Sequence, residues 1–160
     1  MKIKKELPQF ENNPSLLIVL GRQSAEFYLA KNGLIDKKNE INIETPRYSD
    51  REGRFEMRGQ GQTYSSGAVY EDNKGEIRNR FLNKLKETTE QLNKETKIET
   101  VFIFSPDYNL KLAQDHLPQA LQEKVRFTFD GNFKKTHPLK LLERIEEKIQ
   151  EKIVDIPPRK

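Results

Sequence analysis

Residues 15–20 read Ser-Leu-Leu-Ile-Val-Leu and contain the longest uninterrupted apolar run in the chain, between Pro14 and Gly21. A short apolar run with turn formers at both ends predicts a buried β-strand. Residues 24–31 then alternate large and small or polar side chains with a period of two, which is typical of a half-buried strand. Asn32-Gly33 follows directly and is a strong hairpin signal, so a third strand is expected from Leu34 to about residue 44. The first third of the chain is therefore predicted to be an antiparallel meander.

The rest of the chain alternates helical and strand patterns. A helix is predicted from the apolar spacing of Ile77, Phe81, Leu85 and Leu92, and a second from residue 106 to 116. For the second helix, we expect Ser105 as N-cap and Pro106 at the first helical position. Strands are predicted at residues 101–104 and 125–129, a short turn after Pro118, and a terminal helix at 139–153.

This order, β-β-β, loop, α-β-α-β-α, predicts an α/β fold with a mixed sheet of about five strands and packed helices, an antiparallel meander followed by two βα units, of ribonuclease H-like type. We expect an extended N-terminal arm at residues 1–14, one domain at 15–153 with a long central loop at 45–75, and a C-terminal tail at 154–160.

Charge and composition restrict the partners. The formal net charge is +4 and there is no cysteine, which favours an anionic partner such as RNA and excludes disulfides and thiolate zinc sites. The apolar runs are too short to cross a bilayer, so we expect a cytoplasmic protein without membrane contact. The third strand is expected to be exposed, which leaves pairing with a second copy of the chain open.

The central loop has few apolar side chains over roughly 30 residues, whereas connections within a domain usually span about 4–6. Its middle reads Gly59-Gln60-Gly61-Gln62, where glycines permit close backbone approach to a partner. Four arginines precede or enter this stretch and are candidates for contacting RNA phosphates: Arg47, Arg51, Arg54 and Arg58. Acidic residues lie between them, so a solvated charged loop is the alternative interpretation.

Other chemistries find less support in the residues. A two-metal nuclease needs converging carboxylates, and only Glu26 and Asp36 are candidates, each more simply explained as an exposed strand acid. His116 and His137 have no second ligand at metal spacing, so no metal site and no cofactor are predicted. Ser65-Ser66-Gly67 lacks the strand-turn-helix context of a hydrolase nucleophile.

Two groups of residues carry a family resemblance. The first is Gly53-Arg54-Phe55, the Gly-rich stretch, Tyr64 and Phe81. The second is the run from Val101 to Pro106, followed by Leu117-Pro118, Val125, Asp130 and residues 136–139. In order and spacing these resemble the bacterial host-attachment proteins, also described as bacterial proteins like archaeo-eukaryotic release factors, over residues 15–149.

The resemblance implies a fold like the middle domain of class 1 release factors and of the ribosome-rescue factor Pelota. In release factors, a Gly-Gly-Gln loop helps a water molecule to cleave the ester of peptidyl-tRNA. The similar residues here are Gly61 and Gln62, with Gln60 in place of the first glycine, a departure that puts hydrolysis in doubt. The resemblance also implies ribosomal RNA, tRNA or the ribosome as partner.

The leading hypothesis is a translation-associated RNA-binding protein that contacts the ribosome or tRNA through the Gly-Gln loop and, if Gln62 positions water, hydrolyses peptidyl-tRNA. Arg54, Arg58, Gly59, Gln60, Arg47 and Arg51 are the expected RNA contacts. The alternative is a non-catalytic protein-interaction or scaffold domain that keeps only the fold.

Overall fold

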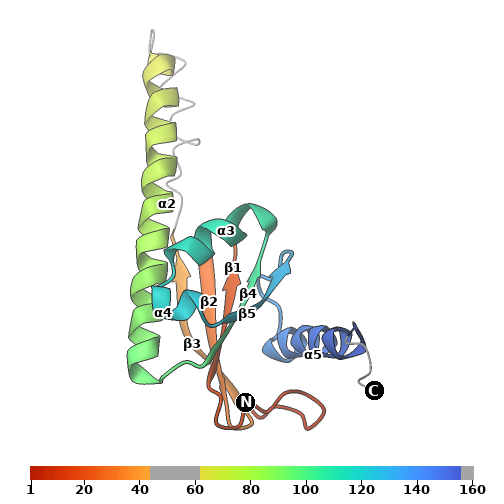
Figure 1. The fold of residues 1–160 in the computed structure, drawn as a ribbon. Helices are drawn as coiled ribbons and strands as arrows, with labels where there is room; N and C mark the ends of the chain where they lie inside the picture. Colours follow the sequence, from red (N-terminus) through yellow and green to blue (C-terminus); the bar gives the residue numbers. More distant parts are fainter. Residues whose placement is uncertain (44–61, 156–160) are drawn as a thin grey trace.

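The structure, a computed structural model, describes residues 1–43 and 62–155, with the backbone alone at 62–74 and 153–155. Five strands form one sheet in the order β3-β2-β1-β4-β5 (Figure 1). They are β1 (Ser15–Leu20), β2 (Ser24–Lys31), β3 (Leu34–Asn42), β4 (Thr100–Ser105) and β5 (Val125–Asp130).

The sheet is mixed, as the sequence predicts. β1 pairs antiparallel with β2, and β2 antiparallel with β3, whereas β1–β4 and β4–β5 are parallel. β1 is the central strand and all six of its residues are buried, which explains its continuous apolar run. The hairpin between β2 and β3 uses Asn32 and Gly33, both with positive φ (47° and 79°), as expected of an Asn-Gly turn.

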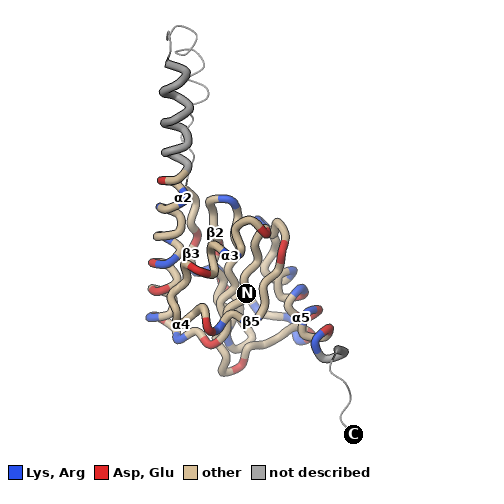
Figure 2. Tube along the Cα trace, turned by 45° about the horizontal axis from the view of Figure 1, so that its top comes forward, with Lys and Arg blue, Asp and Glu red and all other residues tan. Residues whose placement is uncertain are grey.

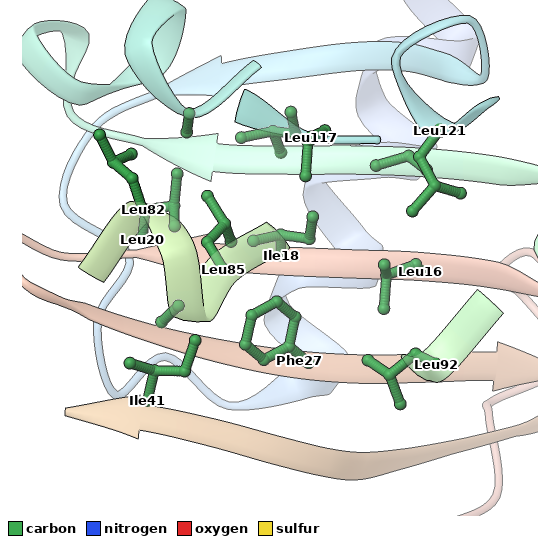
Figure 3. Close-up of a cluster of buried hydrophobic side chains, with 14 of the residues drawn as sticks. Leu16, Ile18, Leu20, Phe27, Ile41, Leu82, Leu85, Leu92, Leu117 and Leu121 are labelled. Atoms are coloured by element: carbon green, nitrogen blue, oxygen red, sulfur yellow. The ribbon is translucent and has the colours of Figure 1, made fainter. Parts of the chain in front are cut away.

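Four helices complete the described fold: α2 (Gln62–Glu95), α3 (Asp107–His116), α4 (Gln119–Gln122) and α5 (Pro138–Asp155). One face of the sheet packs against α2, α3 and the α4 region. Leu16, Ile18 and Leu20 point to this face, where they meet Leu85 of α2 and Leu117 after α3 (Figure 3). This first cluster is largely aliphatic.

The other face packs against α5. Leu17 and Val19 of β1 point to it, because successive side chains of a strand alternate between faces. Here Phe104 stacks on Phe129, with ring centroids 4.5 Å apart and planes 8° from parallel. Leu141, Leu142 and Ile145 of α5 close this second cluster.

The first fourteen residues differ from the extended arm that we expected. Ile3, Leu7 and Phe10 are buried in the cluster on the α5 face. The Ile3 N–H donates to the Gly33 carbonyl at 2.8 Å, and the backbone of Lys2 forms an isolated antiparallel β-bridge with Leu34. These three apolar side chains stand four and three residues apart, which is a helical spacing, yet the segment forms turns and no helix. Their burial therefore depends on the surface that the folded sheet provides.

Two helix starts also differ from the predictions. α2 begins at Gln62, so the part of the predicted loop from 62 to 75 is helical; its residues lack an apolar stripe that would have indicated a helix. α3 begins at Asp107 with Pro106, not Ser105, at the N-cap. Ser105 is buried at the end of β4, and its hydroxyl donates to the Pro106 carbonyl at 2.9 Å instead of capping the helix.

Among the residues described, no helix is both long and apolar enough to cross a membrane. Acidic and basic residues are mixed along α2 and α5 (Figure 2).

Candidate functional site

All six predicted RNA-contacting residues lie outside the described part of the chain: Arg47, Arg51, Arg54, Arg58, Gly59 and Gln60. Gly61, predicted as the neighbour of the catalytic glutamine, also lies outside it. Gln62 is the first residue of α2 and is described by its backbone alone. Their proposed roles are therefore not tested by the geometry, which instead shows where the described ends of the loop lie.

The loop leaves the sheet beside the turn between β1 and β2. At the end of β3, the Ile43 N–H donates to the Gln23 carbonyl at 3.1 Å, and the Gln23 side-chain amide donates back to the Ile43 carbonyl. The turn that holds Gln23 follows the carboxyl end of β1, and α3 follows the carboxyl end of the parallel neighbour β4. In open α/β sheets, ligands bind at the carboxyl ends of the parallel strands, and we call this end of the sheet its carboxyl edge.

α2 extends past this edge. Its 34 residues span about 50 Å, whereas a strand of nine residues such as β3 spans about 30 Å. The section from Ile77 to Leu92 supplies the buried side chains that cover the sheet. The amino-terminal section therefore reaches beyond the sheet (Figure 1).

A groove of about 460 Å³ lies at the same edge, between the β1–β2 turn, α2 and α3. Its floor is apolar, with Phe81 and Leu82 from α2 and Leu112 and Ala113 from α3 among the lining residues. Its polar lining comes from different elements: Arg22 and Gln23 from the turn, Arg78 from α2, and Tyr108 and Asn109 from α3.

The groove has a positive lining. Within the described ranges, Arg22 and Arg78 are its charged lining residues, and no acidic side chain lines it. Glu76, the nearest acid in sequence to Arg78, pairs with Arg80 at 2.9 Å. Among the described residues, no ion pair includes Arg22 or Arg78. The groove therefore offers two guanidinium groups to an anion.

Tyr108 is unusual in its exposure. Its exposed fraction is 66%, the highest among the large hydrophobic side chains described as exposed. It is the second residue of α3 and belongs to the groove lining. An aromatic ring that is open to solvent beside two guanidinium groups offers a stacking surface next to an anion site.

Asn109 fixes the turn to α3. Its side-chain amide donates to the carbonyls of Gly21 at 2.7 Å and Arg22 at 3.3 Å. The turn is itself tight: the Gly21 N–H donates to the Ser24 carbonyl at 2.8 Å, and a Cβ at position 21 would come within 2.4 Å of the Ser24 hydroxyl oxygen. The backbone that carries Arg22 is thus held in place before any ligand arrives.

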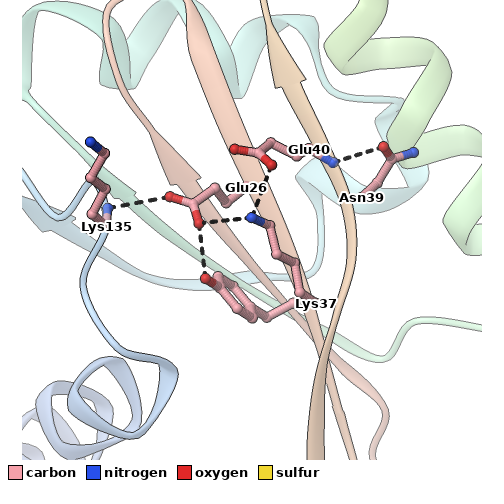
Figure 4. A network of polar contacts seen from close by, with 6 residues as sticks. Glu26, Lys37, Asn39, Glu40 and Lys135 are labelled. Atoms are coloured by element: carbon pink, nitrogen blue, oxygen red, sulfur yellow. Dashed lines mark hydrogen bonds and ion pairs between the residues drawn. The ribbon is translucent and has the colours of Figure 1, made fainter.

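The two carboxylates considered for a nuclease do not converge. Glu26 is only 14% exposed, so its assignment as an exposed strand acid was wrong. It accepts hydrogen bonds from the Tyr28 hydroxyl at 2.9 Å and the Lys135 N–H at 3.3 Å, and pairs with Lys37 at 3.4 Å (Figure 4). Asp36 is exposed and pairs with the amino group of Met1 at 3.0 Å.

The network around Glu26 changes two pKa values. Burial, followed by the hydrogen bond to Glu26, raises the pKa of Tyr28 to about 12. The hydrogen bond from Lys37 to Glu40 raises the pKa of the lysine, with Glu26 adding to the effect. Both shifts favour the protonated forms that donate to the carboxylates, so the network is a structural support between β2, β3 and the segment before α5.

The histidines have local roles. The His116 Nδ1 lies 2.8 Å from the Leu112 carbonyl in the same helix, and the Leu139 N–H donates to the His137 Nδ1 at 3.2 Å at the start of α5. Within the described ranges, no group of three or more His, Asp or Glu side chains is placed to hold a metal ion.

No protein-family model matches this chain. No curated protein matches it either. Among solved structures, the chain is similar to a crystal structure of an archaeal translation termination factor, with a TM-score of 0.48 and 12% identity over 89% of this chain and 40% of that one. It is also similar to an archaeal protein, with a TM-score of 0.42, 12% identity and the same coverage. The chain thus spans 40% of the length of either structure.

The groove residues were missed by the sequence analysis. Arg22, Arg78 and Tyr108 are far apart in the chain, and none belongs to a motif. Tyr108 carried no local signal of exposure, because Leu112 follows it at the four-residue spacing of an ordinary apolar pair on a helix. No local signal relates Arg22 to Arg78.

Proposed function

We propose that this chain is a translation-associated RNA-binding protein that contacts ribosomal RNA or tRNA in the cytoplasm through residues 45–75. One structural observation supports the proposal: β3 ends beside a groove whose charged lining residues, in the described part of the chain, are Arg22 and Arg78. The loop adds Arg54 and Arg58, and Arg47 and Arg51 precede them. Arginine forks suit phosphate oxygens, so the arginines of the loop and those of the groove are all suited to contact an RNA backbone.

Within this proposal, Gln62 is the residue that positions water for hydrolysis of the peptidyl-tRNA ester, with Gly61 as its permissive neighbour. The first turn of α2, which Gln62 begins, carries no acidic residue. Its free backbone N–H groups and the helix dipole favour negative charge, as on the oxyanion of an ester under attack by water. The reaction needs one water molecule, and yields a peptide acid and a free tRNA.

Co-sedimentation with ribosomes tests the RNA-binding proposal. We expect wild-type protein to pellet with ribosomes at low salt and to be released at moderate salt, because phosphate contacts displace counterions. A variant with Gly59→Ala, Gln60→Ala and Gln62→Ala should stay in the supernatant. Wild-type protein that stays in the supernatant at both salt concentrations contradicts the proposal and favours the alternative, a non-catalytic interaction domain that binds a protein.

The loop arginines give a sharper test. Arg54→Ala combined with Arg58→Ala should weaken ribosome binding and leave the thermal unfolding midpoint nearly unchanged. Arg80→Ala is the matched control, because Arg80 is exposed on α2, pairs only with Glu76 in the described structure and does not line the groove. Equal binding by the double variant and the control would remove the loop arginines from the interface.

Hydrolysis is tested separately from binding. With purified peptidyl-tRNA, Gln62→Ala should abolish ester cleavage and retain ribosome binding. If the variant cleaves as fast as the wild type, Gln62 does not position the water.

A further inference from the structure

We propose that the groove between the β1–β2 turn, α2 and α3 binds one unstacked nucleotide of a single-stranded RNA, with its base on Tyr108 and its phosphate between Arg22 and Arg78. The inference extends the proposed function by assigning a nucleotide site outside the Gly-Gln loop. The choice of RNA as the ligand rests on that proposed function, whereas the groove itself consists of described residues alone.

The size of the groove fits this ligand. Its volume of about 460 Å³ lies within the range of about 300–1,000 Å³ that is usual for small-molecule sites. The apolar floor formed by Phe81, Leu82 and Leu112 suits the face and edge of a base. A duplex would not fit, because its bases are stacked and paired within the helix.

The charge of the groove selects a phosphate. Arg22 and Arg78 come from different elements, so an anion in the groove is reached from two directions. A guanidinium group can donate two parallel hydrogen bonds to two phosphate oxygens. In the described part of the chain, no carboxylate lines the groove to compete with a phosphate for these donors. Asn109 holds the turn that carries Arg22, which lowers the entropy cost of forming this contact.

The exposure of Tyr108 is explained by base stacking. A ring with an exposed fraction of 66% contributes little to the core, so nothing in the fold requires an aromatic residue at this position. Stacking between a base and an aromatic ring is tolerant of sequence, because every base has a π-face. We therefore expect the site to bind RNA with weak base preference.

A second charged hollow provides a comparison. It lies between β5 and α5, with a volume of about 190 Å³, and is lined by Arg144 and Lys148 together with Asp130, Glu147 and Glu151. There Arg144 pairs with Glu147 at 3.4 Å and Lys148 with Glu151 at 4.0 Å. Its cations are already neutralised, so Arg144→Ala is a charge-matched control for Arg78→Ala.

The experiment measures fluorescence anisotropy of a labelled single-stranded oligoadenylate of about eight nucleotides. Arg78→Ala and Tyr108→Ala should each weaken binding about tenfold, whereas Tyr108→Phe and Arg144→Ala should bind within about twofold of the wild type. The three wild-type side chains are all exposed, so all four variants should keep the wild-type thermal midpoint.

Salt dependence separates the two roles. Arg78→Ala should flatten the slope of log affinity against log salt by about 0.7, the contribution of one phosphate on a single strand, whereas Tyr108→Ala should leave the slope unchanged. If the two substitutions acted only by disturbing the structure, the salt slopes of Arg78→Ala and Tyr108→Ala would not differ from each other.

Adenosine monophosphate as competitor distinguishes two sources of the nucleotide. Displacement of the oligoadenylate by the mononucleotide would show that the groove also accepts a free nucleotide. Absence of displacement, with the losses in the variants as expected, would show that it binds a nucleotide only within a chain.

Oligoadenylate binding that Arg78→Ala and Tyr108→Ala leave unchanged would overturn the groove assignment, and so would failure of the wild type to bind the oligoadenylate. If ribosome co-sedimentation still depended on the Gly-Gln loop, the proposed function would stand without the groove. If the oligoadenylate bound through the groove but the protein did not bind ribosomes, the groove assignment would stand and the proposed function would be wrong.

Discussion

Each face of the sheet buries a hydrophobic cluster of similar size, but the solvent-exposed surfaces beside the two clusters differ. On the α5 face, aromatic rings fill the space, and Phe104 contacts both Phe129 and Phe133, with centroids 4.5 and 5.2 Å apart. On the α2 and α3 face, mostly aliphatic side chains form the core, and beside it the two helices leave a groove that no acidic side chain of the described residues lines. On the α5 face, the half-buried carboxylate of Glu26 is partnered by Tyr28 and Lys37. The faces thus differ in charge: the hollow beside α5 has paired cations, whereas the groove beside α2 and α3 presents Arg22 and Arg78.

The largest expected effect tests whether the α5 face contributes mainly to stability. Phe104 is fully buried, so Phe104→Ala should lower the free energy of unfolding by about 3–5 kcal/mol through lost apolar contact and a cavity. Urea denaturation measures the loss. Leu85→Ala is the counterpart on the opposite face, is also fully buried, and should cost about 2–5 kcal/mol. A loss below about 1 kcal/mol for Phe104→Ala would show that the aromatic cluster relaxes around the gap.

A smaller effect concerns the pKa of Tyr28. Its folded pKa of about 12 lies above the ordinary value of 10.0, because burial and Glu26 disfavour the phenolate. The unfolded chain therefore releases this proton first, and the contribution of Tyr28 to stability is complete below about pH 10 and lost as pH rises through about 12. Between pH 9 and 11.5, the wild type should lose about 2 kcal/mol more than Tyr28→Phe.

Urea unfolding at the two pH values measures this difference. Lysines titrate in both proteins, and Lys37, whose pKa is also raised, is common to both, so the comparison isolates Tyr28. Parallel losses in the two proteins would show that Tyr28 titrates normally in the folded state.

The hydrogen bonds of Asn109 link stability to the groove. Asn109→Ala should cost about 1 kcal/mol of stability, because two carbonyls of the β1–β2 turn lose their donor. It should also weaken oligoadenylate binding by less than Arg78→Ala does, since Arg22 remains but its backbone is held less firmly. Asn79→Ala, an exposed change on α2, is the control for both readouts. Unchanged binding together with lowered stability would separate the turn from ligand binding.

The smallest effect is expected on the α5 face at Arg144. Its pair with Glu147 is exposed and one helical turn apart, so Arg144→Ala should change the free energy of unfolding by about 0.5 kcal/mol or less. The guanidinium group also lies 5.8 Å from the Phe133 ring centroid, an exposed contact of similar size. Thermal unfolding checks the value. A loss above about 1.5 kcal/mol would mean that the surface of this face contributes to stability as its core does.

The sequence predicted a strand or a helix correctly where the pattern within that one segment is sufficient to identify it. The apolar run of β1, the alternation in β2 and the Asn32-Gly33 turn each report local burial or local backbone geometry, and the elements begin where these patterns begin. The order of elements then restricted the topology to a mixed sheet, because parallel neighbours need a crossover helix. The helical start at Gln62 was missed, since the sequence of residues 62–75 shows no apolar stripe that would mark a helix.

What only the tertiary structure decided is the set of side chains that meet. The Gly-Gln loop drew attention through its composition, yet the groove depends on residues 22, 78 and 108, which become neighbours only when β1, β4 and α2 assemble at one edge of the sheet. Likewise, Glu26 reads as a surface acid in an alternating strand, and Lys37 and Lys135 reach it only in the folded chain. A sequence pattern reports how one element meets the core, because burial repeats along that element. It carries no record of which distant side chains share a groove, because that depends on how whole elements pack against each other.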